Sequence, residues 1–386
     1  MIFRRIKKHL LENNSPRQTI IKNSFWLLAS EFISKLFTFI VTLRIARHLG
    51  VEQFGVSNFV MTFVGFFVIV TDFGLSNLVY REISKHSESL EKYFVNALVL
   101  KLLLSLGIIL IAFVVSCLVG KAHAYQGLIM LYLGYAILTN FSEFVRVFFR
   151  PSEHMQYEAF LKIITAIIFV IFSYIFIVRF GTLEGLFFGY FISSVAYFLF
   201  SFVYTTKKLH IKNFSVDKKF MKNLARMAIP FFLGGIFVYF YSDINIVMLG
   251  FFRGEHDVGI FSAPYRIIFY VYILLNIFSI SFFKKLVDGT KKIEQFKHFL
   301  NKYILVSLGI SGFFVLCVLI FGGRIITTVY GDKYVGSILI FKLLSFLVIA
   351  KSLSYVFGTG LTSFSQEYKR FWIQVVVAGI NVILNL

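Results

Sequence analysis

The stretch Thr42–His86 reads TLRIARHLGVEQFGVSNFVMTFVGFFVIVTDFGLSNLVYREISKH, and part of it recurs in the second half of the chain. Leu49–Val56 reads LGVEQFGV, and Arg253–Ile260 reads RGEHDVGI. The two copies share a pair of glycines at one spacing: Gly50 with Gly55, and Gly254 with Gly259. Each copy joins two long apolar segments, so the repeat predicts a two-lobed membrane protein. The alternative is a chance similarity of two glycine-containing loops.

The composition excludes an ordinary soluble protein. Apolar residues make up 58% of the chain, charged residues make up 15%, and the mean hydropathy is +0.81. A soluble core of 386 residues could not bury that much apolar surface, whereas a bilayer can. The basic start of the chain is followed by a polar break rather than a cleavage site, so we expect no cleavable signal peptide.

Eleven weakly charged segments are long enough to span a bilayer, at about 20 residues each. They cover residues 22–43, 56–79, 94–119, 124–149, 160–179, 184–205, 226–250, 259–283, 303–322, 335–357 and 371 onward. With the N-terminus in the cytoplasm, 27 lysines and arginines lie on the cytoplasmic side and seven on the other. This bias predicts that orientation. The net charge of +20 therefore indicates topology and contact with anionic lipid, not nucleic acid.

These segments predict an all-α integral membrane protein with about 11–12 transmembrane helices. We expect a cytoplasmic segment (1–21), an N-lobe of six helices (22–205), a cytoplasmic linker (206–225) and a C-lobe of about five helices (226–386). The sequence stops inside an apolar segment, so we expect either that the end of the C-lobe with the natural C-terminus is missing or that the last helix is unusually short.

Several charged residues fall inside the predicted spans, where charge is costly and usually faces the bundle interior. Glu31 and Lys35 are one helical turn apart in the first span and share a polar stripe. They predict either a wall of a water-lined cavity or an ion pair that holds the bundle together. Glu143, Arg146 and Arg150 form a similar stripe in the fourth span.

Asp72 and Asp243 have no basic residue one turn away, so each is expected to pair with another helix or with a ligand. Arg266 and Lys351 lie within later spans. Buried cations suit an anionic, phosphate-bearing ligand, which predicts substrate binding by Lys35, Arg146, Arg150, Arg266 and Lys351. Membrane acids suit proton or sodium exchange, which predicts ion coupling or gating by Glu31, Asp72, Glu143 and Asp243.

No enzyme motif appears, so we predict a protein that is not an enzyme and has no catalytic residues, metal ligands or cofactor. The histidines are scattered, mostly through loops, and both cysteines, Cys117 and Cys317, lie in apolar spans without metal-ligand spacing.

Two motifs resemble a known family. The first is LRIARHLGVEQFGVSNF followed by TDFGLSNLVYREI, and the second is YSDINIVMLGFFRGEHDVGIFSAPYRI. They resemble the polysaccharide flippase family of the MOP superfamily, the Wzx-like O-antigen and capsule exporters, to which the multidrug MATE exporters are distantly related. Asp72 and Asp243 match the acids of the two motifs.

The resemblance implies a MATE-like pair of lobes around a cavity that opens alternately to each side. It implies a cargo of undecaprenyl-diphosphate-linked oligosaccharide, an O-antigen (lipopolysaccharide) or capsule unit, moved across the bacterial inner membrane. Expected partners are this lipid-linked oligosaccharide, H⁺ or Na⁺, membrane lipids, and a polysaccharide polymerase with its chain-length regulator. Alternatives are a MATE-type drug/cation antiporter, a membrane polysaccharide polymerase or glycosyltransferase, and a structural scaffold.

Overall fold

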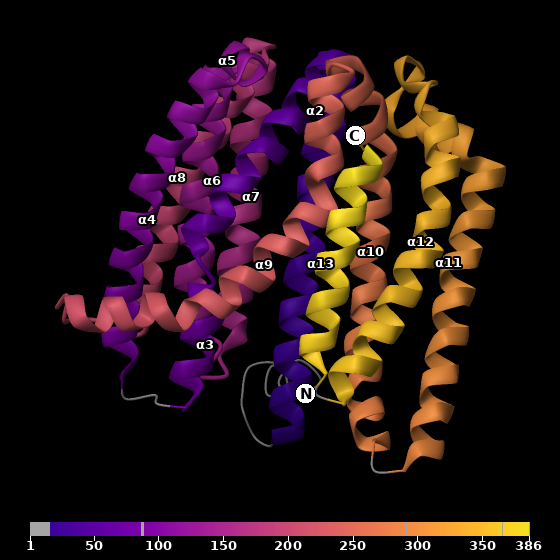
Figure 1. Ribbon diagram of the computed structural model, residues 1–386. Coiled ribbons are helices and arrows are strands. Elements are labelled where there is room, and N and C mark those ends of the chain that lie inside the picture. Colours follow the sequence, from indigo (N-terminus) through magenta and orange to yellow (C-terminus); the bar gives the residue numbers. More distant parts are fainter. Residues whose placement is uncertain (1–15, 86–88, 291, 365, 386) are drawn as a thin grey trace, which may run out of the picture. The chain divides into compact units, whose positions relative to one another are not determined.

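The computed structural model describes residues 16–85, 89–290, 292–364 and 366–385, and across these ranges the chain is helical with no strand (Figure 1). Of the predicted cytoplasmic segment 1–21, residues 1–15 lie outside the described ranges. The helices are α2 (Pro16–Asp72), α3 (Leu75–Lys85), α4 (Leu90–Leu118), α5 (Gly120–Ala124), α6 (Gln126–Val147), α7 (Met155–Phe180), α8 (Leu183–Lys208), α9 (Lys218–Phe252), α10 (Glu255–Gly289), α11 (Ile293–Tyr330), the 3₁₀ turn η2 (Asp332–Tyr334), α12 (Ser337–Ser363) and α13 (Glu367–Asn385).

The all-α membrane fold is confirmed. Eight helical stretches among the described residues have the length and composition of a membrane span. One of them, Phe25–Ser84, has 60 residues. At about 1.5 Å per residue it is long enough to cross a bilayer twice. The chain is therefore a multi-pass membrane protein.

The repeated turn has the same backbone conformation in both copies. Gly50 interrupts α2 at φ 83° and ψ −178°, and Gly254 precedes α10 at φ 107° and ψ 179°. This region of φ/ψ space is accessible essentially only to glycine. The two glycines therefore allow the same kind of turn in each copy, and Gly331 adopts a similar conformation at φ 96° and ψ 171° before η2.

The two copies of the turn pack against each other reciprocally. A Cβ placed on Gly55 would lie 1.8 Å from the carbonyl oxygen of Glu255, and one on Gly259 would lie 2.2 Å from that of Val51. Val51 and Glu255 hold corresponding positions in the repeat. The same backbone contact is thus made twice, once in each direction.

The described chain forms two compact units, one of residues 16–45 and 60–236, the other of residues 46–59 and 237–385. Residues 46–59, which contain the turn at Gly50, therefore belong to the same unit as the second half of the chain. The helix α2 nevertheless begins and ends in the first unit. The predicted lobe boundary at the 206–225 linker stays a prediction.

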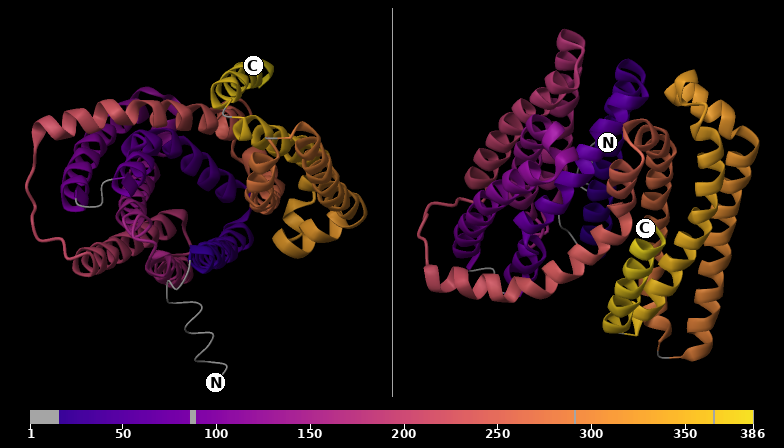
Figure 2. Two further views of the ribbon diagram at one scale, coloured as in Figure 1. Left: turned by 90° about the horizontal axis from the view of Figure 1, so that it is seen from below. Right: turned by 45° about the horizontal axis from the view of Figure 1, so that its top comes forward.

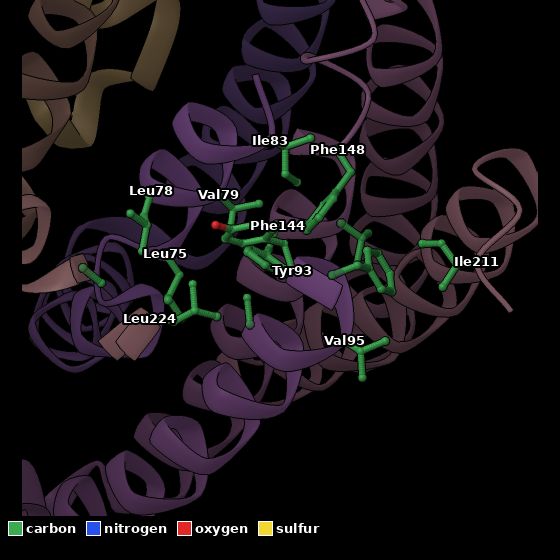
Figure 3. Close-up of a cluster of buried hydrophobic side chains, with 14 residues drawn as sticks. Leu75, Leu78, Val79, Ile83, Tyr93, Val95, Phe144, Phe148, Ile211 and Leu224 are labelled. Atoms are coloured by element: carbon green, nitrogen blue, oxygen red, sulfur yellow. The ribbon is translucent and has the colours of Figure 1, made fainter. Parts of the chain in front are cut away.

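The first unit contains a buried apolar cluster that joins α3, α4, α6 and the start of α9 (Figure 3). Leu75 and Phe94 belong to it, and α9 contributes Leu224 and Ala228. Figures 1 and 2 show that this first part of α9 runs across α4 and α6 rather than along them. Pro230 lies inside α9 after this part, at a position where a helix is expected to bend.

Candidate functional site

The polar stripe of α2 holds a carboxylate between two ammonium groups. Lys35 Nζ lies 3.7 Å from Glu31 Oε1, and Lys162 of α7 donates a hydrogen bond to Glu31 Oε2. All three side chains are partly exposed, at 35% for Glu31, 39% for Lys35 and 25% for Lys162. Two cations therefore share one acid, and the group carries a net positive charge when all three are ionised.

This polar stripe is separate from the exposed apolar face of α2. Phe32 and Leu36 are exposed and each follows a member of the charged pair by one residue, which is about 100° around a helix. Together with Leu28 and Ile40 they repeat every four residues. The helix can therefore present apolar side chains to lipid while Glu31 and Lys35 lie on another face.

Arg146 connects α6 to the same helix α7. Its guanidinium Nη1 donates to Thr165 Oγ1 at 3.0 Å, and Thr165 Oγ1 donates to the carbonyl of Lys162 at 2.8 Å. Glu143, one turn before Arg146, lies 3.9 Å from it. The Arg146 side chain is 7% exposed, whereas that of Glu143 is 61% exposed. Glu31 and Arg146 are thus linked through adjacent turns of α7.

Asp72 has a partner on α4. Lys101 Nζ donates to Asp72 Oδ1 at 2.8 Å, and Ser76 Oγ donates to the same oxygen at 2.5 Å. The Lys101 side chain has no exposed surface and lies over the ring of Phe144, 5.0 Å from its centroid. A fully buried ammonium needs such a carboxylate, because an unpaired charge there is expensive.

Arg150 is held by a different acid. Its Nε and Nη2 donate to the two oxygens of Glu158 at 2.9 and 2.7 Å, a bidentate geometry. Arg150 follows α6 and Glu158 lies in the first turn of α7, so the pair closes the connection between these helices. Its charge is therefore already neutralised in this arrangement.

The second unit contains the remaining predicted residues. Arg266 donates through Nε and Nη2 to Asn58 Oδ1 at 3.0 and 2.7 Å and interacts electrostatically with Asp243. Asn58 in turn donates to the Phe54 carbonyl at 2.8 Å. Lys351 Nζ lies 5.7 Å from the ring centroids of Tyr272 and Tyr355, a cation–π distance.

The structure thus brings together Glu31 with Lys35, Glu143 with Arg146, and Asp243 with Arg266. The roles assigned to these residues stay predictions. Residues that the sequence analysis did not place in the site are Lys101, Thr165, Lys162, Glu158 and Asn58. Lys162 is the third residue of the predicted span 160–179, and from that position it is expected at the cytoplasmic end of the span. The helix begins at Met155, which puts Lys162 two turns inside it.

In the described part of the chain, histidine, cysteine, aspartate and glutamate side chains form no group of three that could hold a metal ion. The charged groups described above contact one another and hydroxyl and amide partners.

Comparisons with known proteins agree with this architecture. The chain is 25% identical over 350 residues to the probable low-salt glycan biosynthesis flippase Agl15 of Haloferax volcanii, covering 88% of this chain and 71% of that protein. It superposes on lipid II flippase MurJ in an inward closed conformation with a TM-score of 0.77 at 13% identity, over 92% of this chain and 80% of that one. An inward-facing multidrug resistance MATE family transporter of the MOP superfamily gives a TM-score of 0.70 at 15% identity, over 89% and 83%.

The two structural likenesses establish a MATE-like fold. The family match extends further, because residues 20–283, well over half of the chain, match the sequence pattern of one family along both motifs singled out above. The chain belongs to the polysaccharide biosynthesis protein family.

Proposed function

We propose that this protein is a flippase that moves an undecaprenyl-diphosphate-linked oligosaccharide, an O-antigen or capsule unit, from the cytoplasmic to the periplasmic leaflet of a bacterial inner membrane. In this proposal the N-terminus is cytoplasmic and the two lobes alternate in opening to each side. Family membership and the similarity to a glycan flippase support the class of cargo.

The observation that carries the proposal is the group formed by Glu31, Lys35 and Lys162. Two ammonium groups around one carboxylate leave a net positive charge on partly exposed side chains within membrane-spanning helices. A diphosphate can compete with Glu31 for both ammoniums, because phosphate oxygens accept the same charge-assisted hydrogen bonds as a carboxylate. A cationic drug would be repelled by this group, which disfavours a MATE-type drug antiporter.

Arg146 of α6 adds a further positive charge beside α7, next to the group of Glu31, Lys35 and Lys162. It uses Nη1 for Thr165 and lies 3.9 Å from Glu143, so its planar group is not fixed in a bidentate pair. We propose that it provides charge to the cargo, together with Lys35, Arg266 and Lys351. Glu31, Asp72, Glu143 and Asp243 are proposed to exchange H⁺ or Na⁺ as the lobes move, and a polymerase is the proposed acceptor of the product.

The test is transport by single charge-removal variants at matched protein level. Lys162→Gln leaves Glu31 paired with Lys35, and Lys35→Gln leaves it paired with Lys162, so neither change orphans the acid. Each should lower transport at least about tenfold, as expected for losing a hydrogen bond to a charged group. Arg146→Gln should do the same, and Arg146→Lys should retain more activity.

Transport is measured as surface glycan in the source strain lacking its chromosomal copy, and as accumulation of lipid-linked oligosaccharide inside. The control is Lys297→Gln, which removes an exposed charge near the start of α11. Wild-type glycan export by Lys162→Gln and Arg146→Gln would overturn the proposed binding role.

A further inference from the structure

The first part of α9, residues 218–229, has three different faces. Phe220, Leu224 and Ala228 pack on the buried cluster of the first unit. Lys219, Lys222 and Arg226 form an exposed stripe at spacings of three and four residues. A third stripe, Met221, Ala225 and Ile229, is apolar, and the Ile229 side chain is 43% exposed. A helix attached to protein on one face and divided into apolar and basic stripes on the others is suited to a membrane interface.

The connection before α9 continues this amphipathic surface. Phe214 is 55% exposed and Val216 is 51% exposed, although both are apolar. They lie a few residues from the basic stripe in a segment without regular structure. Exposed apolar side chains can insert at the acyl boundary of a lipid leaflet, while neighbouring lysines contact its headgroups.

The basic stripe borders an open groove of about 560 Å³ that is lined by Lys219, Lys222, Arg226, Asn223, Phe220 and Asp217. The single acid in this lining is already engaged. Asp217 Oδ1 accepts the backbone N–H of Phe220 at 3.0 Å, and Asp217 Oδ2 lies 3.0 Å from Lys92 Nζ. The positive charge of the stripe is therefore not offset by Asp217.

We propose that residues 212–229 form a binding site for anionic phospholipid of the surrounding leaflet. Lys219, Lys222 and Arg226 contact the headgroup phosphates, while Phe214, Val216 and Ile229 enter the acyl boundary. The course of this segment across α4 and α6 places it along the membrane plane rather than through it. The inference rests on a membrane-embedded chain and is independent of the cargo proposed above.

Brominated lipids provide a direct test with the full-length protein. Trp26 and Trp372 are replaced by phenylalanine, and Met221→Trp places one fluorophore on the apolar stripe. The protein is reconstituted in phosphatidylcholine vesicles that contain either brominated phosphatidylglycerol or brominated phosphatidylcholine. Each surface cation should raise the local concentration of an anionic lipid about fivefold. We therefore expect brominated phosphatidylglycerol to quench the fluorescence of this tryptophan at least tenfold more strongly than brominated phosphatidylcholine, and this ratio is the preference.

Replacing Lys219, Lys222 and Arg226 together with glutamine should bring the preference close to one. The matched control replaces three other exposed cations, Lys292, Lys297 and Lys302, with glutamine and should keep it. Phe214→Ser with Val216→Ser should weaken quenching by both lipids while keeping their ratio.

Three results would overturn the inference. The first is equal quenching by the two lipids in the parent protein. The second is a preference that survives the triple replacement in protein that elutes as a single folded species. The third is loss of the preference in millimolar inorganic pyrophosphate at constant ionic strength, which would identify a site for soluble phosphates instead.

Discussion

Lys101 places its buried ammonium 2.8 Å from the carboxylate of Asp72, and the two residues lie on different helices, α4 and α2. The acid of the first family motif is thereby committed to a protein partner in this arrangement. A substitution of Asp72 can therefore affect transport in two ways. It removes the carboxylate itself, and it leaves the buried ammonium of Lys101 without this partner.

A double replacement separates these sources. Asp72→Asn should lower the free energy of unfolding by about 3 kcal/mol or more, because it leaves a buried cation unpaired. Adding Lys101→Gln should recover much of this loss, measured as thermal unfolding in detergent. If the double variant is stable but still fails to export glycan, the Asp72–Lys101 pair acts in the mechanism and not only in folding. An Asp72→Asn protein as stable as the parent would contradict the predicted dependence of Lys101 on this acid.

The reciprocal glycines should be intolerant of a methyl group. Gly55→Ala and Gly259→Ala each place a Cβ against a backbone oxygen that cannot rotate away, and the crowding should cost about 1–3 kcal/mol. Gly107→Ala is the control, because no atom lies within 4 Å of its added Cβ. That change should be neutral or slightly stabilising in the middle of α4. Equal unfolding temperatures for Gly55→Ala and Gly107→Ala would show that the contact tolerates a side chain.

Cysteine labelling tests the orientation. With Cys117 and Cys317 replaced by alanine, Lys212→Cys should react with an impermeant maleimide only after cells are permeabilised. His256→Cys should react in intact cells. Both positions are exposed and lie on either side of the spanning part of α9. The opposite pattern would reverse the predicted topology.

The connection between α6 and α7 should be sensitive to mild acid. Burial, followed by the positive charges of Lys22 and Lys208, lowers the pKa of His154 below its usual range. His154 therefore binds a proton more readily in the unfolded chain than in the folded protein. The contribution of neutral His154 to stability is fully present above the ordinary histidine pKa of about 6.5. It is lost as the pH falls from there through the lower pKa of the folded state. His154→Gln should flatten the fall in unfolding temperature between about pH 7.5 and 5. An unchanged slope would contradict this assignment.

Much of the fold could be predicted from apolar segments and glycines, because both act locally. Segment length fixes a spanning helix, and Gly50 fixes the break in α2 through its backbone conformation. The partners of the charged residues could not be predicted in this way, because they depend on how the helices pack. Arg266 pairs with Asn58, 208 residues away in the sequence, and helical spacing within one span does not reveal such a contact. Lys162 lies near the start of its predicted span, where a lysine is expected to reach the interface, and its contact with Glu31 of α2 depends on the packing of two helices.

The reciprocal contact of Gly55 and Gly259 has a consequence for the history of this chain. Two equivalent surfaces that touch in the same way in both directions are related by a two-fold rotation, as in an isologous dimer. A surface of this kind is self-complementary, so an ancestral half-length chain carrying a single turn would have been able to pair with an identical copy. Duplication and fusion of its gene would then have joined two subunits in one polypeptide and allowed the copies to diverge, with Val51 in one and Glu255 in the other.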